Sequence, residues 1–303
     1  MRFALAVTVL ATSILIAPVQ AQPTASAPDL LATVVTRSDN AMRMTVPVMI
    51  EGRGPFQFVV DTGSDRTVVS RELATLLKLT AGEPVTMHSM TGVGPANTVN
   101  VPTLTLAGQT TRDINAPALL QDDLGSHGLL GIDTLKGRRV VMDFAKRTLS
   151  VLRADEKEQF DRDTIVVTAR SKYGQLVLVD ADVDGTPITV IIDSGAQNTI
   201  GNAPLRTLLA KRNRKMQFFK TALIDVTGGR LDAEYAAVGH IRIAGIRVEN
   251  AVIAFADAHP FKRYGLLNKP AMLLGMDTLR GFRRVSVDFS QRKVRFLPPG
   301  SLG

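Results

Sequence analysis

The sequence of 303 residues predicts a mostly β protein made of two similar lobes. Two observations support this fold class. First, residues 55–68 (PFQFVVDTGSDRTV) and residues 187–200 (PITVIIDSGAQNTI) share one pattern, in which apolar residues lead into Asp, then Thr or Ser, then Gly. Second, residues 129–137 (LLGIDTLKG) and residues 273–281 (LLGMDTLRG) repeat another pattern in the same order. A duplication of this kind indicates two copies of one structural unit.

The composition allows a folded core but does not identify a function. Hydrophobic residues make up 45% and charged residues 21%, which is typical of a globular protein. The formal net charge of +8 is compatible with binding to nucleic acid, with an anionic membrane or with a basic secreted protein. The chain has no cysteine, so disulfides, thiolate zinc sites and cysteine nucleophiles are excluded.

The N-terminal segment resembles a cleavable secretory signal, expected over residues 1–21. Arg2 precedes an apolar run from Phe3 to Ala17, and small residues stand where a signal peptidase would cleave. The run is shorter than the ~20 residues that a membrane anchor needs, and no later stretch is apolar enough to span a bilayer. We therefore expect a periplasmic or secreted protein in which residues 22–35 form a flexible leader.

The first copy, expected over residues 36–153, begins with a β-hairpin. Met44–Ile50 and Phe56–Val60 are apolar or β-branched runs joined by a turn that contains Gly and Pro. Arg71–Lys78 (RELATLLK) has apolar residues at helical spacing, so it predicts a short helix. A second hairpin is expected over residues 140–152.

The second copy, expected over residues 164–303, repeats these elements. Leu176–Val183 and Ile188–Ile192 are the counterparts of the first hairpin, and Pro204–Arg212 (PLRTLLAKR) is the counterpart of the helix. Residues 154–163 between the copies are mostly charged and show no apolar period, which predicts a solvated linker.

Asp133 and Asp277 occupy matching positions in the second motif. Each precedes a Thr-Leu pair that is expected to begin a single turn of helix. An aspartate near the start of a helix commonly accepts hydrogen bonds from its free backbone amides. We therefore expect both residues to act as helix caps.

The strand–Asp–Thr/Ser–Gly pattern resembles the active-site loop of aspartic proteases, and the aliphatic–aliphatic–Gly pattern resembles the strand beneath that loop. Both motifs occur in both copies, in the order of the family, and span nearly all of the chain after the expected signal. The sequence is thus similar to the retropepsin-like (clan AA) aspartic proteases, with two lobes fused as in pepsin; its LLGxD and VxxDF segments look nearest to the bacterial periplasmic branch. The resemblance implies a bilobal acid-protease fold, with two retropepsin-like β-barrel lobes related by a pseudo-twofold axis.

The resemblance makes Asp61 and Asp193 the expected catalytic pair, one from each lobe. Amide hydrolysis by water needs a general base and an acid together. Two carboxylates held about 3 Å apart share one proton and so supply both. A single Asp-x-Gly segment would more simply be a turn, but two matched copies favour a shared dyad.

Four neighbours are expected to support these loops directly. Gly63 and Gly195 permit a tight turn where a Cβ would clash. In the family, the hydroxyls at the positions of Thr62 and Ser194 bond to the opposite loop and hold the pair rigid.

The next residue differs between the copies, because Ser64 follows the first glycine and Ala196 the second. A hydroxyl can donate to a carboxylate and lower its pKa, whereas alanine cannot. We therefore expect an asymmetric dyad in which Asp61 is the charged member and Asp193 carries the proton.

A glycine-rich segment between the two motifs of each copy is a candidate flap. These segments are Met87–Pro95 (MHSMTGVGP) and Asp225–Arg230 (DVTGGR). A glycine-tipped hairpin can close over substrate and exclude water; an ordinary surface hairpin is the alternative. Neither segment has the tyrosine of pepsin's single flap, which favours the two-flap retroviral arrangement. The expected substrate-contacting residues are Met90, Thr91, Gly92, Thr227, Gly228 and Gly229.

The sequence departs from many retroviral members at Ile132 and Met276, which follow the glycine of the second motif. Arginine is common there in the family and makes an ion pair between lobes. That ion pair is not expected in this chain.

Other functions fit the sequence less well. Asp193-Ser194-Gly195 could suggest a serine hydrolase, but no histidine lies in a partner motif. The four histidines are scattered and lack metal-ligand spacing, so neither a metal nor an organic cofactor is expected. The chain has no phosphate loop and no tryptophan, and the basic run Lys211–Lys215 fits a helix end, so nucleic-acid binding is not expected.

The remaining alternative is a non-catalytic peptide-binding or scaffold protein that keeps the fold. Such a loss usually removes an Asp or Gly from one lobe, and both loops are intact here. We therefore expect an aspartic endopeptidase that binds a peptide or protein substrate in extended conformation. Because one chain supplies both aspartates, a monomer suffices; a domain-swapped dimer is the alternative.

Overall fold

The computed structural model describes residues 32–35, 43–153, 161–178 and 181–299. The expected signal peptide, most of the expected leader and residues 154–160 of the expected linker lie outside these ranges. Within them, no helix has the length and apolar character needed to cross a membrane.

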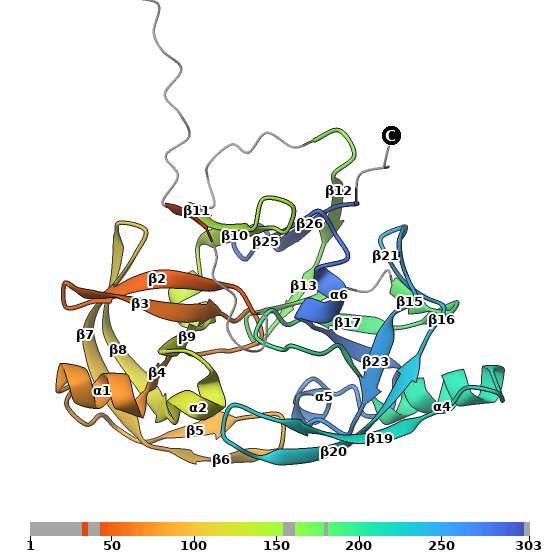
Figure 1. The fold of residues 1–303 in the computed structure, drawn as a ribbon, viewed down its shortest axis with the longest axis horizontal. Coiled ribbons are helices and arrows are strands. Elements are labelled where there is room, and N and C mark those ends of the chain that lie inside the picture. Colours follow the sequence, from red (N-terminus) through yellow and green to blue (C-terminus); the bar gives the residue numbers. More distant parts are fainter. Residues whose placement is uncertain (1–31, 36–42, 154–160, 179–180, 300–303) are drawn as a thin grey trace, which may run out of the picture.

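The first lobe is built around a closed barrel of six strands in the order β2-β3-β9-β4-β8-β7, to which the hairpin β5-β6 is added (Figure 1). Its elements are β2 (Thr45–Ile50), β3 (Arg53–Val60), β4 (Val68–Ser70), α1 (Arg71–Leu77), β5 (Val85–His88), β6 (Val93–Ala96), β7 (Thr98–Leu106), β8 (Gln109–Leu119), α2 (Gln121–Leu124), β9 (Gly128–Leu130), α3 (Ile132–Leu135), β10 (Arg138–Asp143) and β11 (Thr148–Arg153).

The second lobe has an eight-stranded sheet, β13-β14-β17-β24-β18-β23-β20-β19, and a four-stranded sheet, β16-β15-β21-β22. Its elements are β12 (Ile165–Thr168), β13 (Arg170–Lys172), β14 (Gln175–Leu178), β15 (Ala181–Val183), β16 (Thr186–Pro187), β17 (Thr189–Ile192), β18 (Ile200–Gly201), α4 (Ala203–Arg212), β19 (Phe219–Ile224), β20 (Arg230–Ala237), β21 (His240–Ile243), β22 (Ile246–Glu249), β23 (Val252–Phe255), α5 (His259–Arg263), β24 (Ala271–Leu274), α6 (Met276–Leu279), β25 (Arg284–Asp288) and β26 (Lys293–Leu297).

One six-stranded sheet joins the lobes and lies at the top of Figure 1, opposite the hairpins β5-β6 and β19-β20. Its order is β1-β11-β10-β25-β26-β12, so β10 of the first lobe pairs directly with β25 of the second. Its outermost strand, β1 (Ala32–Val35), pairs with β11. The segment expected to be a flexible leader therefore ends in a strand.

The sequence signals at the start of each lobe correspond to real elements, with one difference. The two runs expected as the first hairpin form β2 and β3; most of β2 is buried, and β3 runs from an exposed start to a buried end. In the second lobe, the run Leu176–Val183 was expected to be one strand. It contains β14 and β15, which join different sheets, so the expectation of a single strand was wrong.

Matching side-chain caps begin the two longest helices. The Ser70 hydroxyl accepts from the amide of Leu73 at 3.1 Å at the start of α1. The Asn202 side chain accepts from the amide of Leu205 at 3.1 Å at the start of α4. Each cap satisfies an amide that has no partner inside the helix, and so fixes the helix that follows each Asp-containing loop.

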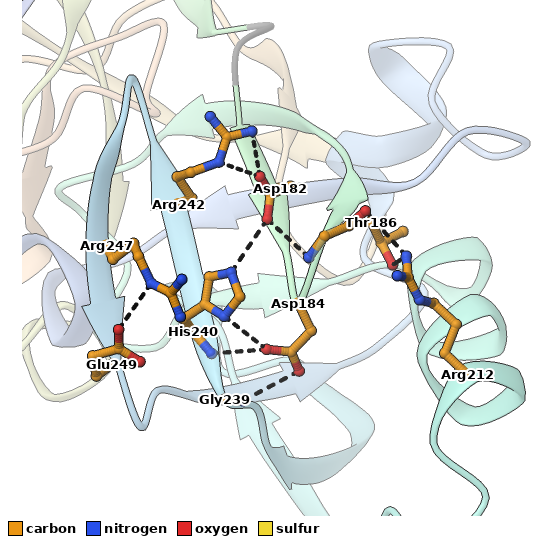
Figure 2. A network of polar contacts seen from close by, with 10 residues as sticks. Asp182, Asp184, Thr186, Arg212, Gly239, His240, Arg242, Arg247 and Glu249 are labelled. Carbon is orange, nitrogen blue, oxygen red and sulfur yellow. Dashed lines mark hydrogen bonds and ion pairs between the residues drawn. The ribbon is translucent and has the colours of Figure 1, made fainter.

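A network of polar contacts connects the strands of the four-stranded sheet in the second lobe (Figure 2). The buried carboxylate of Asp182 accepts from Arg242 at 2.5 Å, and the Asp184 carboxylate accepts from the backbone amide of His240 at 2.8 Å. The His240 ring lies between the two carboxylates, 3.5 and 3.3 Å from their oxygens. Arg212 joins from α4 by donating to the Gly185 carbonyl at 3.0 Å. These contacts fasten a helix and two hairpins to one another.

Candidate active site

Each expected catalytic aspartate directly follows a central strand of its lobe. Asp61 follows β3, which runs parallel to β9, and Asp193 follows β17, which runs parallel to β24. The backbone amide of Asp61 donates to the Leu130 carbonyl at 3.0 Å, and that of Asp193 donates to the Leu274 carbonyl at 3.1 Å. The strand of the second motif therefore supports the loop of the first motif in both copies.

The two loops meet so closely that each aspartate fills the space beside the other loop's glycine. A Cβ added to Gly63 would lie 2.5 Å from Oδ1 of Asp193, and a Cβ added to Gly195 would collide with the Asp61 carboxylate. Any side chain at either position would displace a carboxylate. The glycines are thus required by contact across the lobe boundary, as well as by the turn within each loop.

Thr62 and Ser194 exchange hydrogen bonds across the lobe boundary. The Thr62 hydroxyl donates to the Ile192 carbonyl at 3.0 Å and accepts from the amide of Ser194 at 3.0 Å. The Ser194 hydroxyl donates to the Val60 carbonyl at 2.8 Å and accepts from the amide of Thr62 at 3.1 Å. Both side chains are buried, so these bonds fix the relative position of the two loops.

Asp133 and Asp277 each accept from a first-turn amide of their helices, as expected: Asp133 from the amide of Thr134 at 2.8 Å and Asp277 from that of Thr278 at 2.6 Å. The N-terminal caps of α3 and α6 are glycines without side-chain bonds. Asp133 also accepts from the backbone amide of Thr67 at 2.9 Å and from its hydroxyl at 2.7 Å. Asp277 accepts from the amide of Thr199 at 2.9 Å and from its hydroxyl at 2.5 Å. These carboxylates therefore anchor the far end of each catalytic loop.

Burial is the largest influence on the ionisation of the dyad. It raises the pKa of Asp61 to about 7; the charge of Asp193 adds to the rise, while the Gly63 amide and the Arg43 guanidinium oppose it. Burial also raises the pKa of Asp193, against the amides of Ala196 and Gly195 and the charge of Arg43. Two such carboxyl groups retain a shared proton at a pH where exposed aspartates would be ionised.

The hydroxyl of Ser64 does not bind the dyad. It donates to the Arg66 carbonyl at 2.8 Å, and it is the backbone amide of Ser64 that interacts with Asp61. The predicted donation from this hydroxyl to a carboxylate was wrong. The Ser64/Ala196 difference therefore gives no basis for naming Asp61 as the charged member.

Both candidate flaps are hairpins, and their tips touch each other. Met87–Pro95 spans the β5-β6 turn, and Asp225–Arg230 spans the β19-β20 turn. Asp225 accepts from the backbone amide of Thr91 at 3.1 Å and from its hydroxyl at 2.7 Å. Within its own turn it also accepts from the amides of Thr227 and Gly229, at 2.9 and 3.0 Å. The two hairpins meet at the bottom of Figure 1, on the side of the molecule opposite the shared sheet.

A cleft of about 410 Å³ lies between the hairpins and the dyad. Met90 of the first hairpin packs against the apolar core of the second lobe, and Val226 of the second hairpin packs against a core cluster of the first lobe. Of the six residues expected to contact substrate, Met90 alone lines this cleft, where it is joined by other residues of the two candidate flaps: Met87, His88, Ser89, Asp225 and Val226. Residues Thr91, Gly92 and Thr227 line a neighbouring pocket of about 580 Å³. Gly229 lies beside Thr91 at the contact between the hairpins, and Gly228 lies beside Asp123 of α2.

Two histidines that are distant in the sequence meet beside the first hairpin, although the sequence suggested only scattered histidines. His88 Nδ1 lies 2.9 Å from His259 Nε2, and the rings stack with centroids 5.2 Å apart. The backbone amide of His259 also donates to the Met90 carbonyl at 2.8 Å. Burial, the neighbouring His88 and two nearby cations lower the pKa of His259. The start of α5 thus holds the first hairpin closed.

Sequence reasoning missed a second pair of residues beside the dyad, Arg43 and Gln175. Both are buried and donate to the opposite catalytic loop. Each stands 18 residues before the aspartate of its lobe, so counting back from both aspartates would have found them. No group of three or more acidic or histidine side chains among the described residues could hold a metal.

Buried aspartates on two interlocked loops, covered by paired hairpins, define the architecture of an aspartic protease. Comparison with family models agrees with this class. Residues 46–137 match the family described as gag-polyprotein putative aspartyl protease, and residues 179–278 match the family described as aspartyl protease. The chain therefore belongs to the retropepsin-like aspartyl proteases, with one such domain in each lobe. A search of curated proteins found no match.

Proposed function

We propose that the protein is an aspartic endopeptidase that hydrolyses peptide bonds with a water activated jointly by Asp61 and Asp193. The observation that carries this proposal is the interlocking of the two loops, which places each catalytic carboxyl group against the glycine of the other lobe. Burial that raises the pKa of both aspartates favours a dyad with one shared proton.

In this mechanism the ionised aspartate accepts a proton from water as the oxygen attacks the peptide carbonyl. The protonated aspartate donates a hydrogen bond to the carbonyl oxygen, where negative charge develops. Collapse of the tetrahedral intermediate breaks the C–N bond, and a carboxyl group of the dyad returns a proton to the leaving nitrogen. The dyad ends the cycle with the same single proton. No metal or organic cofactor takes part in these steps.

The substrate is an extended peptide bound between the hairpins and the dyad. Hairpin strands at the cleft offer backbone groups for strand-like hydrogen bonds, and the cleft lining combines polar with apolar groups. The expected signal sequence supports a periplasmic or secreted location, where unfolded or extended proteins would be available as substrates. One chain contributes both aspartates, so we infer that the monomer is the active unit.

Cleavage of a mixture of unstructured peptides by the purified protein tests the proposal. Asp61→Asn and Asp193→Asn should each lower the rate by at least about 10³-fold, because each removes one half of the acid–base pair. Asp113→Asn, at an exposed position of β8 with a positive φ of 54° that asparagine tolerates, is the matched control and should retain full activity.

Binding measurements distinguish the proposed enzyme from a non-catalytic peptide-binding protein. A statine-type peptide, whose hydroxyl mimics the tetrahedral intermediate, should bind the parent tightly and both dyad variants much more weakly. A folded parent that binds peptides but cleaves none of them would reject the enzymatic proposal and favour the scaffold alternative.

A further inference from the structure

Arg43 and Gln175 make equivalent contacts across the lobe boundary. Both are buried, with exposures of 6% and 3%. Arg43 Nη1 donates to the carbonyl of Gly195 at 3.3 Å, and Gln175 Nε2 donates to the carbonyl of Gly63. Each side chain thus binds the loop that carries the other lobe's aspartate. This contact is separate from the hydroxyl exchange made by Thr62 and Ser194.

Each of the two side chains also bonds a second partner, which lies at the end of a short helix: α2 for Arg43 and α5 for Gln175. Arg43 Nη2 donates to the Leu124 carbonyl at the end of α2, and Gln175 Oε1 accepts from the hydroxyl of Tyr264, which follows α5. Burial raises the pKa of Tyr264, so its hydroxyl stays protonated and able to donate. Both side chains are therefore fixed at two points.

The two positions match in geometry but differ in charge, since one is a guanidinium and the other a neutral amide. We propose that Arg43 and Gln175 are positioning residues that lock the catalytic loops together, and that the Arg43 charge, present in one lobe only, sets the pH range in which the dyad holds one proton. This inference rests on the proposed protease function for its kinetic consequences.

A nearby cation stabilises negative charge on the dyad, and so favours the loss of each of its protons. Arg43 accordingly lowers the pKa of both aspartates against the larger effect of burial. The pH range in which the dyad holds one proton ends at high pH, where the dyad loses that proton, and at low pH, where it gains a second one. The Arg43 charge therefore moves both limits toward acid.

Other charged or titratable groups also surround the dyad, and the test leaves them unchanged. Asp65 pairs with Arg263 at 2.5 Å beside Tyr264. The remaining groups that line the cleft are Asp123, Asp225, Tyr235 and His88. Because these groups are common to every variant, differences between variants report on positions 43 and 175.

The experiment compares pH profiles of peptide cleavage for the parent, Arg43→Gln and Arg43→Lys. Arg43→Gln should shift both the acidic and the basic limb of the pH profile to higher pH, by roughly half a pH unit or more. Arg43→Lys keeps the charge and should leave both limbs in place. The double variant Arg43→Gln/Gln175→Arg restores one cation on the other side of the dyad and should return both limbs toward the parent. If Arg43→Gln lowers the rate but leaves both limbs at the same pH, the proposal that the Arg43 charge sets the pH range is overturned.

A second pair of variants decides the question if Arg43→Gln does not fold. Gln175→Glu should shift both limbs of the pH profile to higher pH, and Gln175→Lys should shift them to lower pH, because the two variants add opposite charges at the matched position. Shifts in the same direction would overturn the proposal. NMR titration of isotope-labelled aspartate carboxyl groups gives the same comparison without catalysis. A parent that cleaves nothing would therefore reject the protease function, while this titration would still decide the role of Arg43.

Discussion

Thr91 of the first hairpin donates both its backbone amide and its hydroxyl to one oxygen of Asp225 in the second hairpin. The two flaps are therefore joined tip to tip through a single carboxylate. Burial alone would raise the pKa of Asp225, but hydrogen bonds from Thr227, Thr91 and Ser89 together lower it. The carboxylate therefore stabilises the joined hairpins above its ordinary pKa, and this contribution is lost only as the pH falls through the lowered value.

Asp225→Ala should loosen both hairpins and weaken substrate binding. The variant removes two charge-assisted bonds between the hairpins, so we expect KM for a peptide substrate to rise about tenfold. Amide hydrogen exchange should accelerate in β5 and β6. Asp232→Ala is the control, because Asp232 lies in β20 with a side chain that is 93% exposed. Unchanged exchange in Asp225→Ala would contradict a role in joining the flaps.

The contact between His88 and His259 should make closure of the first hairpin sensitive to pH. The lowered pKa of His259 means that the closed state prefers the neutral ring. Closure is therefore fully favoured above the ordinary histidine pKa of about 6.5, and weakens as the pH falls below that value. Hydrogen exchange in β5 and β6 should be faster at pH 5 than at pH 7.5.

His88→Gln provides the comparison for that experiment. It removes one ring of the pair while leaving His127 and His240 in place, so the exchange rates in β5 and β6 should depend less on pH. An equally steep dependence in this variant would assign the effect to another group.

Thr67→Val and Thr199→Val should destabilise the protein without changing the chemistry of the dyad. Each removes a buried threonine hydroxyl that donates to an aspartate behind the catalytic loop, at an expected cost of about 1–3 kcal/mol in the free energy of unfolding. Urea denaturation measures this change. Thr168→Val, at an exposed position of β12, should change stability by less than about 0.5 kcal/mol. Equal effects in all three variants would refute the anchoring role.

The dyad should make the folded protein less stable as the pH rises from about 4 to about 7. Because the pKa of Asp61 is raised to about 7, the folded state binds a proton that the unfolded chain has already released, and this contribution disappears as the pH passes through the raised value. Asp61→Asn should therefore be more stable than the parent at pH 8, on the order of 2 kcal/mol. Denaturation at pH 5 and pH 8 tests the sign. A parent whose stability, measured relative to Asp61→Asn, rises over this range would contradict the raised pKa.

The catalytic loops could be predicted from the sequence because their chemistry requires the same few consecutive residues in both copies. The positions of Arg43 and Gln175 escaped notice because comparing repeats favours identical residues, and these two perform the same contact with different side chains. The two positions can be matched by their equal distance in sequence from the catalytic aspartates, and not by the identity of their residues. The local pattern around Asp133 and Asp277 predicted their bonds to helix amides. Their second partner was missed for another reason, because each is a threonine far away in the chain.

Strand positions were predictable from apolar runs, but sheet membership was not. The run that begins with Leu176 has no polar interruption before Asp180, so nothing in it signals that β14 and β15 join different sheets. Likewise, residues 22–35 have the polar start typical of a leader, while the pairing of β1 with β11 depends on an edge that only the folded first lobe provides.

The seam between β10 and β25 has a register that is symmetric in itself. Val140 pairs with Val287 and Met142 with Val285. In the repeat, Val140 corresponds to Val285 and Met142 to Val287, so the two pairs exchange places under the pseudo-twofold axis. A chain cut between the lobes would leave each half with an unpaired edge strand. The same register would suit a second copy of that half, so separated halves should self-associate, and a single lobe would be hard to obtain as a stable monomer.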